Sequence, residues 1–323
     1  MFHLNFNPPV STIKLSHEND IVFMGSCFSE HISQRLLELK FNVNSNAFGI
    51  VFNPISISTL LLNSIKLTSF NEKHFIEREG SWFHLDSHSQ LHATTKSELN
   101  TLLNNLNLEL HAKLKTAQWL FLTFGSAYVY EYVPSKSIVA NCNKLPHTNF
   151  VKRLLTVNEI VESYSELVKE LKSINPNLQV VFTVSPVKHL RDGIVENNLS
   201  KSVLIQSVHE LVNNHSNCNY FPVYELVTDD LRDYRFFEAD MAHPNKQSVN
   251  YVFDKFAMTY FSKKKKKINK DIIDINSALN HRPFNENSAS HKTFKNAMLL
   301  KCKSLVNIYP FLNLKKEILF FGK

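Results

Sequence analysis

A short apolar run that stops at a glycine sets the pattern of the whole chain: Ile21-Val22-Phe23-Met24-Gly25-Ser26-Cys27. Four consecutive apolar residues, β-branched ones among them, are typical of a buried strand, and Gly25 marks a turn. The stretch over residues 34–40 then places leucines at helical spacing. The order is therefore strand, turn and helix.

The same unit recurs along the chain. Further candidate strands lie at residues 41–43, 119–124, 179–184 and 220–224. Amphipathic helical spacing separates the later ones, over residues 160–171 and 203–212. Apolar strands that alternate with such helices form parallel sheets covered on both faces. We therefore predict an α/β fold, a three-layer α/β/α sandwich with a mainly parallel sheet, whose ligands gather at the carboxyl ends of its strands.

A run of five lysines, residues 263–267, marks a change in composition. Beyond it, residues 271–280 and 288–308 have helical spacing with little β character. We predict one domain over residues 1–262 and a C-terminal helical extension over residues 263–323. The lysine run is interpreted as a solvated connector between helices.

Composition excludes several classes of function. The chain has 323 residues but only six glycines, and phosphate loops and dinucleotide fingerprints both need clustered glycines. The lysine run supplies five of the seven net positive charges, so we expect no nucleic-acid partner. The start lacks a secretory signal and no apolar run approaches the roughly 20 residues of a membrane span. We expect a cytoplasmic protein.

The residues that commonly bind metals are dispersed. The four cysteines contain no closely spaced pair, which favours free thiols over disulfides or a structural zinc. His84, His88 and His92 recur every four residues in a segment that does not look helical, and we expect them at the surface or in a lid. No metal and no organic cofactor is predicted.

The turn after the first strand carries a possible nucleophile. Ser26 and Cys27 lie where the strand becomes a helix, and the unpaired N–H groups of a helix start favour a thiolate. We expect a lowered pKa for Cys27 and a contribution of these N–H groups to an oxyanion hole. The alternative is that Cys27 is an inert packing residue and Ser26 a helix cap.

A possible general base lies near the end of the first domain, in Asp240-Met241-Ala242-His243-Pro244. Pro244 fits the first turn of a helix, so Asp240 and His243 belong to the preceding loop. At this spacing a carboxylate can hold one imidazole nitrogen and leave the other as a base. The motif alone is common by chance.

In combination, these motifs resemble the GSCFA-domain family. The resemblance runs in order from about residue 1 to 310, and its further motifs are Asn46-Ala47-Phe48-Gly49-Ile50, Thr123-Phe124-Gly125-Ser126, Asn141-Cys142-Asn143-Lys144-Leu145-Pro146, Ser185-Pro186-Val187-Lys188-His189 and Asn280-His281-Arg282-Pro283-Phe284. The family is grouped with the SGNH/GDSL hydrolases. The resemblance therefore implies a flavodoxin-like sandwich with a nucleophile, an aspartate and a histidine.

The resemblance also implies roles for single residues. Cys27 takes the place of the nucleophilic serine, and whether it or Ser26 attacks stays open. Asp240 and His243 complete the triad. The expected oxyanion donors are the N–H of Gly49 and, where these hydrolases have an asparagine, either Ser126 after Gly125 or Asn141.

Two residues after the fourth strand are candidates for substrate binding. His189 and Arg191 lie at the expected active edge, and Arg191 can bind a carboxylate or phosphate. Arg191 and Asp192 can equally form an ordinary salt-linked turn.

These interpretations together predict a hydrolase that acts on an ester or acyl group, carbohydrate-linked groups included. The expected partner is a small-molecule or glycan acyl substrate. The alternatives are an acyltransferase with the same triad and an inactive ligand-binding protein that kept the fold. The sequence does not indicate an oligomeric state.

Overall fold

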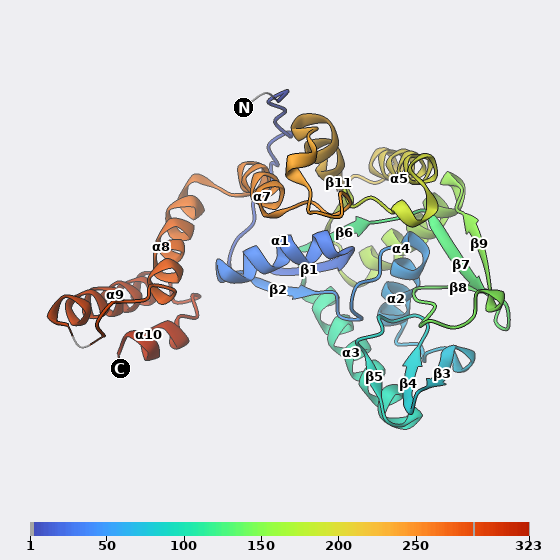
Figure 1. Ribbon diagram of the computed structural model, residues 1–323, viewed down its shortest axis with the longest axis horizontal. Helices are drawn as coiled ribbons and strands as arrows, with labels where there is room; N and C mark the ends of the chain where they lie inside the picture. The colour runs from blue at the N-terminus through green and yellow to red at the C-terminus, as the bar shows by residue number, and fades with distance from the viewer. Residues whose placement is uncertain (1–2, 287, 323) are drawn as a thin grey trace. The chain divides into compact units, whose positions relative to one another are not determined.

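A computed structural model describes residues 3–286 and 288–322 of the chain (Figure 1). Its central sheet has five strands in the order β11-β10-β6-β1-β2. Their bounds are β1 Asp20–Gly25, β2 Asn42–Ser45, β6 Trp119–Phe124, β10 Gln179–Val184 and β11 Cys218–Tyr220. β6 pairs in parallel with β1 and β10, and β10 pairs in parallel with β11. The predicted α/β fold with a mainly parallel sheet is confirmed.

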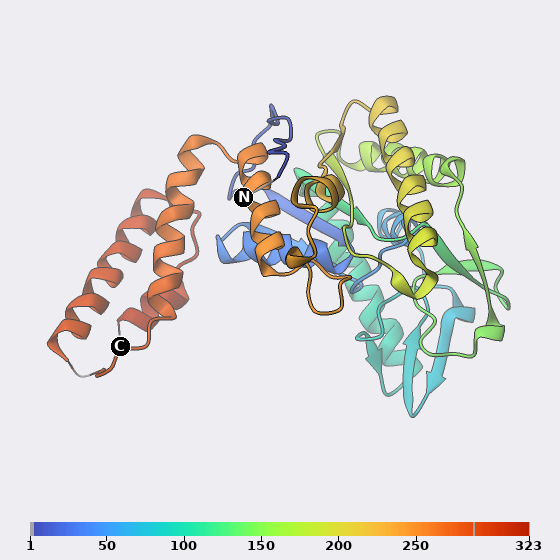
Figure 2. The same ribbon diagram turned by 45° about the horizontal axis from the view of Figure 1, so that its top comes forward.

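Both faces of the sheet are buried, which explains the unbroken apolar strands. Alternate residues point to opposite faces. Val22, Leu120 and Val180 belong to a core shared with four helices, α2 Pro54–Lys66, α3 Lys96–Thr116, α4 Val157–Ile174 and α5 Ile194–Asn214. On the other face the rings of Phe23 and Phe121 stack at 4.6 Å. The start of α1 Cys27–Glu38 and residues 246–255 of α7 Lys246–Tyr260 cover that face (Figures 1 and 2).

The strand order brings together the loops that carry the candidate site. β1 is followed by β2 on one side, whereas β6, β10 and β11 extend the sheet on the other side. The direction of winding therefore reverses between β1 and β6. In open α/β sheets, ligands bind at such a switch point, outside the carboxyl ends of the strands.

One predicted strand is partly wrong. β11 ends at Tyr220, and the helical turn α6 Val223–Glu225 replaces the rest of the predicted strand over 220–224. Pro222 lies between the two elements. Because proline has no N–H to give to a neighbouring strand, pairing stops before it.

Two small antiparallel sheets were not predicted from the sequence. The first has the strands β3 Phe75–Arg78, β4 Ser81–His84 and β5 His92–Ala93. The second has β7 Tyr128–Tyr132, β8 Ser137–Val139 and β9 Phe150–Leu154, in the order β8-β7-β9. Their strands are short and half-buried, so they lack the apolar runs of the central sheet.

The chain divides into two compact units. Unit 1 comprises residues 1–8, 20–33 and 43–255, and unit 2 comprises residues 9–19, 34–42 and 256–323. Unit 2 contains the helices α8 Lys263–Leu279, α9 Ala289–Ile308 and α10 Lys315–Phe321. The lysine run is not a connector, because it forms the first turn of α8, which Ser262 caps. The boundary at residue 262 stays a prediction.

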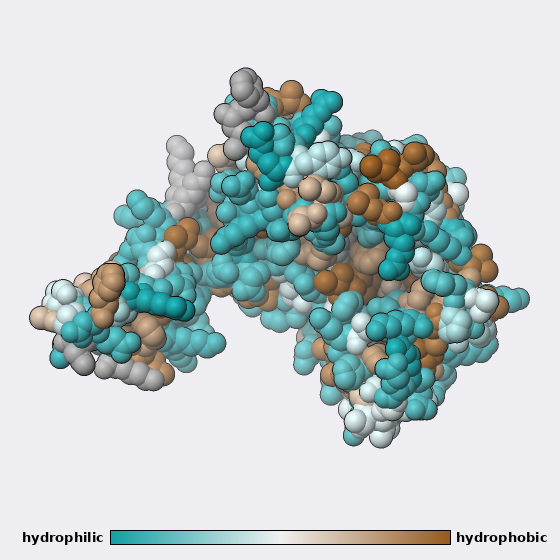
Figure 3. Space-filling model, viewed as in Figure 1, coloured by the Kyte–Doolittle hydropathy of each residue, from teal (hydrophilic) through white to brown (hydrophobic). Residues whose placement is uncertain are grey.

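Within residues 3–286 and 288–322, no helix combines the length and the apolar composition needed to cross a bilayer. On the face shown in Figure 3, hydrophobic side chains form small separate groups among hydrophilic ones.

Candidate active site at the carboxyl edge of the sheet

The turn between β1 and α1 is pressed against the end of β6. Gly25 has a φ of +142°, and a Cβ at this position would lie 2.2 Å from the carbonyl oxygen of Thr123. The N–H of Ser26 donates to the same oxygen at 3.1 Å. Only glycine permits so close an approach. The turn thereby places Cys27 at the first residue of α1, above the carboxyl end of β1.

The two candidate nucleophiles differ in accessibility. Ser26 is 4% exposed, and its buried Oγ has no hydrogen-bond partner in the described chain. Cys27 is half-buried. A group that attacks a substrate must be reachable by it, so the geometry favours Cys27 over Ser26.

The electrostatic environment of Cys27 differs from the sequence prediction. Burial raises the pKa of its thiol, and the Glu30 carboxylate raises it further. The backbone N–H groups at the start of α1 and the ammonium of Lys201 act in the opposite direction. The predicted lowering of the pKa is wrong, because loss of solvent outweighs the helix terminus.

Lys201 is a site residue that the sequence analysis missed. It lies on α5 with 1% of its surface exposed, and its Nζ donates to the carbonyl oxygens of Gly125 at 2.6 Å and Ser185 at 2.7 Å. Burial lowers its pKa to about 7, whereas Cys27 raises it. Lys201 therefore joins the ends of β6 and β10 and brings a positive charge towards the thiol.

The signal for Lys201 was present in the sequence. Lys201 precedes Leu204 by three positions and Val208 by seven, and the side chains of Leu204 and Val208 are fully buried. This spacing places a lysine on the apolar face of a helix. Lysine is almost never fully buried without a partner, so its position points to a function.

The Asp240–His243 loop is organised by hydrogen bonds from the aspartate. Oδ1 of Asp240 accepts the N–H groups of Ala242 at 2.9 Å and His243 at 3.0 Å, and Oδ2 lies 2.6 Å from Nδ1 of His243. The two backbone bonds, with the His243 ring, lower the pKa of Asp240 to about 2. A carboxylate on Nδ1 makes this nitrogen the donor and leaves Nε2 as a base. Both side chains are 51% exposed.

One backbone hydrogen bond joins this loop to the rest of the edge, and charges act between neighbouring side chains there. The N–H of Lys188, just after β10, donates to the Ala242 carbonyl at 3.1 Å. Burial lowers the pKa of His189 to about 4, and Lys201 and His243 both add to the lowering. Lys201 in turn acts on Cys27. In the part of the chain that the structure describes, no hydrogen bond joins Cys27 to His243.

The predicted oxyanion donors already form other hydrogen bonds. The N–H of Gly49 donates to the Asn46 carbonyl at 2.7 Å, and the N–H of Gly125 donates to the Phe52 carbonyl at 2.8 Å. Oγ of Ser126 accepts the N–H of Tyr128 at 3.0 Å and lies 3.3 Å from Oγ of Ser200. These glycine N–H groups would have to leave their present partners to bind an oxyanion.

Asn141 was a predicted oxyanion donor, whereas no role was predicted for Asn46. Oδ1 of Asn141 accepts the N–H of Asn143 at 2.8 Å, and the Asn141 N–H donates to Leu85. Asn141 is thus held in structural hydrogen bonds to Asn143 and Leu85. Asn46 instead lies beside the nucleophile turn, since its Oδ1 accepts the N–H of Gly25 at 2.9 Å and its Nδ2 donates to Glu30 at 3.3 Å.

Comparison with known proteins identifies the family. The GSCFA family model matches residues 20–256, and the model of the GSCFA C-terminal domain matches residues 272–323. The chain belongs to the GSCFA family. No curated protein matches it significantly. Among solved structures, a Clostridium thermocellum family 3 carbohydrate esterase matches at 12% identity and a TM-score of 0.33, over 81% of this chain and 98% of that one.

The remaining predicted residues of this GSCFA protein lie after β10. The ring of His189 packs against Phe52 at 5.1 Å, and its backbone N–H donates to Asn197 at 2.9 Å. Arg191 is exposed in the short helix η3 Leu190–Asp192. Asp192 pairs with Lys152 across to β9, so the salt link observed for Asp192 differs from the predicted turn.

Proposed function

We propose that this GSCFA protein is an SGNH-type hydrolase that acts on an ester or acyl group, with Cys27, His243 and Asp240 as its triad. The observation that carries the proposal is the 2.6 Å contact between Asp240 and Nδ1 of His243, which leaves Nε2 as a base. The position of Cys27 directly after β1, at the switch point of the sheet, supports the same assignment.

The reaction would proceed through a thioester. Sγ of Cys27 attacks the acyl carbon while Nε2 of His243 takes the thiol proton, and His243 then returns this proton to the departing alcohol. Water, deprotonated by the same nitrogen, hydrolyses the thioester. Because burial and Glu30 raise the pKa of Cys27, the resting group is a thiol, and the base is required for attack. The proposal requires the His243 loop to move towards Cys27, because no hydrogen bond joins the two residues in the described part of the chain.

Lys201 has an electrostatic role in this scheme. Its ammonium stabilises the sulfur anion as the proton leaves, and its two carbonyl partners hold it at the ends of β6 and β10. Lys201 is a positioning residue here rather than a catalytic one.

A hollow beside the His243 loop supports a glycan-linked acyl substrate. It has a volume of about 270 Å³, and Tyr224, Tyr234 and Phe237 line it together with Lys188 and Arg232. Nζ of Lys188 lies 4.9 Å from the Tyr234 ring and 4.8 Å from the Phe237 ring. Aromatic faces with charged groups at the rim suit a sugar, which has both apolar faces and hydroxyl groups.

Acyl transfer is the second candidate function. A thiol nucleophile forms a thioester, which an alcohol can intercept before water does. The presence of Cys27 where these hydrolases have serine is the observation that favours it. The ratio of transesterified to hydrolysed product in the presence of a sugar alcohol separates the two activities.

The test is intact-mass spectrometry after incubation with short-chain acyl esters and thioesters. We expect an acyl adduct on the wild-type protein that is lost in Cys27→Ala, retained in Ser26→Ala, and formed at least about 100-fold more slowly in His243→Ala. An adduct that survives in Cys27→Ala and disappears in Ser26→Ala would reassign the nucleophile. If all variants and the wild type stay unlabelled while a sugar ester still binds, the protein is a binding protein.

A further inference from the structure

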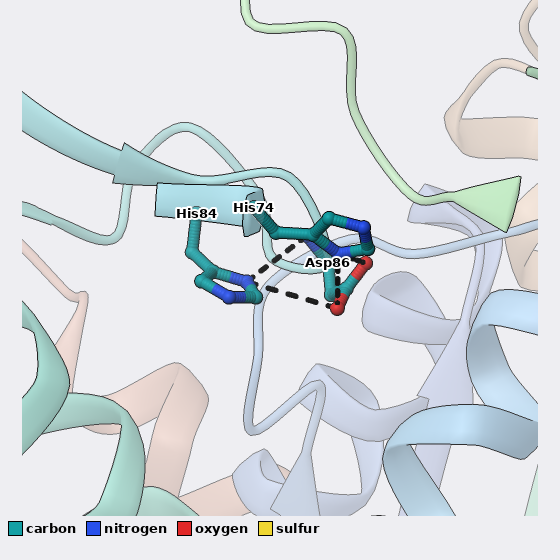
Figure 4. A group of neighbouring side chains, drawn as sticks. All are labelled: His74, His84 and Asp86. Carbon is teal, nitrogen blue, oxygen red and sulfur yellow. Dashed lines mark hydrogen bonds and ion pairs between the residues drawn. The ribbon is translucent and has the colours of Figure 1, made fainter. Parts of the chain in front are cut away.

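A second cluster of chemically competent side chains lies in unit 1, away from Cys27. Nδ1 of His74 lies 2.9 Å from both carboxylate oxygens of Asp86, and its Nε2 lies 2.9 Å from Oγ of Ser135 and 3.2 Å from Oγ of Ser137. His74 ends the short helix η1 Glu72–His74, Asp86 follows β4, and the serines flank the start of β8. Figure 4 shows the His74 ring facing the Asp86 carboxylate.

The hydrogen bonds determine the tautomer of His74. Its Nδ1 faces only a carboxylate, so this nitrogen carries the proton. Its Nε2 faces the two hydroxyls and, at 3.4 Å, the side-chain amide of Asn71, all of which can donate. A serine hydroxyl, an imidazole and a carboxylate in this order form a nucleophile, base and orienting group. His74 is 2% and Asp86 7% exposed, so the pair is held by the fold.

His84 makes a metal centre the alternative reading. One atom each from His74, His84 and Asp86 lie within 4.8 Å of one another. However, Nδ1 of His84 already accepts the N–H of Asp86 at 3.2 Å, and Nε2 faces the Asn71 carbonyl at 3.2 Å. The His84 ring also packs edge-on against Phe75 at 4.6 Å. His84 is fully buried, contrary to the predicted surface position, and both its nitrogens are engaged.

A hollow beside the cluster offers room for a small substrate. Its volume is about 460 Å³, and its lining includes His74, Asp86 and Ser137. Asn63 and Lys136 line the same hollow and provide N–H donors of the kind that stabilise an oxyanion. Oγ of Ser135 lies 2.8 Å from Oγ of Ser137, but Ser135 is not among the residues that line the hollow. The accessible hydroxyl is therefore that of Ser137.

We propose that Ser137, His74 and Asp86 form a second hydrolytic site, which takes a small acyl ester independently of Cys27. Oγ of Ser137 bonds to the acyl carbon as its proton passes to Nε2 of His74, and the ester C–O bond breaks as the alcohol leaves with that proton. Water then cleaves the acyl-serine, its proton following the same route. Asp86 orients His74 throughout.

The experiment uses an alkyl fluorophosphonate on the full-length Cys27→Ala protein, so that failure of the proposed Cys27 site does not affect the result. Attack by Ser137 forms an O–P bond and releases fluoride. We expect one phosphonyl adduct per chain by intact mass. Trypsin cleaves after Lys136, so a label on Ser137 falls in the peptide 137–144, where fragmentation distinguishes it from a label on Cys142, whereas a label on Ser135 falls in the preceding peptide.

Variants test the mechanism without relying on one substitution. Labelling should disappear in Ser137→Ala and slow by about 100-fold or more in His74→Gln and Asp86→Asn, but remain in Ser173→Ala, which removes an exposed hydroxyl on α4. Thermal melts confirm folding of each variant. Absence of any adduct, an adduct on another side chain, or equal rates in His74→Gln would overturn the proposal. So would one equivalent of zinc bound by the wild type and lost in His84→Phe.

Discussion

At the scale of single residues, burial raises the pKa of Cys27, and two charges of opposite sign change it further. Glu30, in the first turn of its own helix, raises the pKa of the thiol, and Lys201, from α5, lowers it. Burial adds to the effect of Glu30 and decides the direction. Substitution of either Glu30 or Lys201 should therefore change the reactivity of the thiol.

Substitution of the two neighbours should change the thiol in opposite directions. In Lys201→Met the loss of the ammonium raises the pKa of Cys27 further, so alkylation by iodoacetamide at pH 6, below the pKa of about 7 of Lys201, should slow severalfold. In Glu30→Gln it should accelerate, because a repelling carboxylate is removed. The rates are measured on the Cys27 peptide by mass spectrometry over a range of pH.

Lys255 provides a matched control for the loss of a buried lysine. It is 5% exposed, and its Nζ donates to the Phe6 carbonyl at 2.6 Å and to Asn7 at 2.8 Å. Lys255→Met should leave the alkylation rate of Cys27 unchanged. If it slows alkylation as much as Lys201→Met does, the effect comes from loosened packing and not from charge.

At the scale of secondary-structure elements, the site depends on how closely the β1–α1 turn approaches β6. The approach leaves no room for a side chain at position 25, and the positive φ of Gly25 disfavours any L-residue there. The turn is thus a rigid junction of two strands and a helix. Addition of a single Cβ atom at position 25 should therefore disturb both the fold and the position of Cys27.

We expect Gly25→Ala to lower the free energy of unfolding by about 3 kcal/mol or more, since its Cβ would meet backbone atoms that cannot rotate away. Gly80→Ala is the control. Gly80 also has a positive φ, of +73°, but nothing lies within 4 Å of its would-be Cβ. Only backbone strain of about 1 kcal/mol should result there. Equal losses in urea denaturation would show that conformation, not close approach, determines the effect.

At the scale of the whole molecule, the second unit is assembled from three separate stretches of chain. Within it, Leu15 donates its N–H to the Tyr260 carbonyl at 3.0 Å, and Lys40 pairs with Glu317 at 2.5 Å. The ring of His17 stacks on Phe41 at 4.0 Å. Residues near the amino terminus are therefore part of the core of the C-terminal unit.

His17 should make unit 2 sensitive to acid. Burial, with a smaller effect of Lys265, lowers its pKa from 6.5 to about 4. The unfolded chain therefore binds a proton at a pH where the folded unit does not. Stability is unaffected above pH 6.5 and falls between pH 6.5 and 4, by about 3 kcal/mol when complete.

The measurement is hydrogen exchange of the amides of α8 and α9 in the wild type and in His17→Gln. The wild type should lose more protection than the variant between pH 7.5 and 4, after correction for intrinsic exchange rates. At pH 7.5, protonation of His17 should contribute nothing to the difference in amide protection between the two proteins. An equal loss in both proteins would assign the acid sensitivity to other groups.

The sequence alone determined the features that depend on neighbours along the chain. Apolar runs and helical spacing predict β1, β6, β10 and the helices α4 and α5, because burial of a strand or a helix face repeats at short intervals. The hydrogen bond between Asp240 and His243 was predictable for the same reason, since only two residues of one loop separate its partners.

Only the tertiary structure decided what surrounds those features. Lys201 bonds to the ends of β6 and β10, the N–H groups of Gly49 and Gly125 bond to backbone carbonyls, and His74 contacts Ser137. In each case packing or a turn brings the residues together. The direction of the Cys27 pKa shift belongs here as well. It depends on how much solvent the folded chain excludes, and that quantity exists only once the elements have packed.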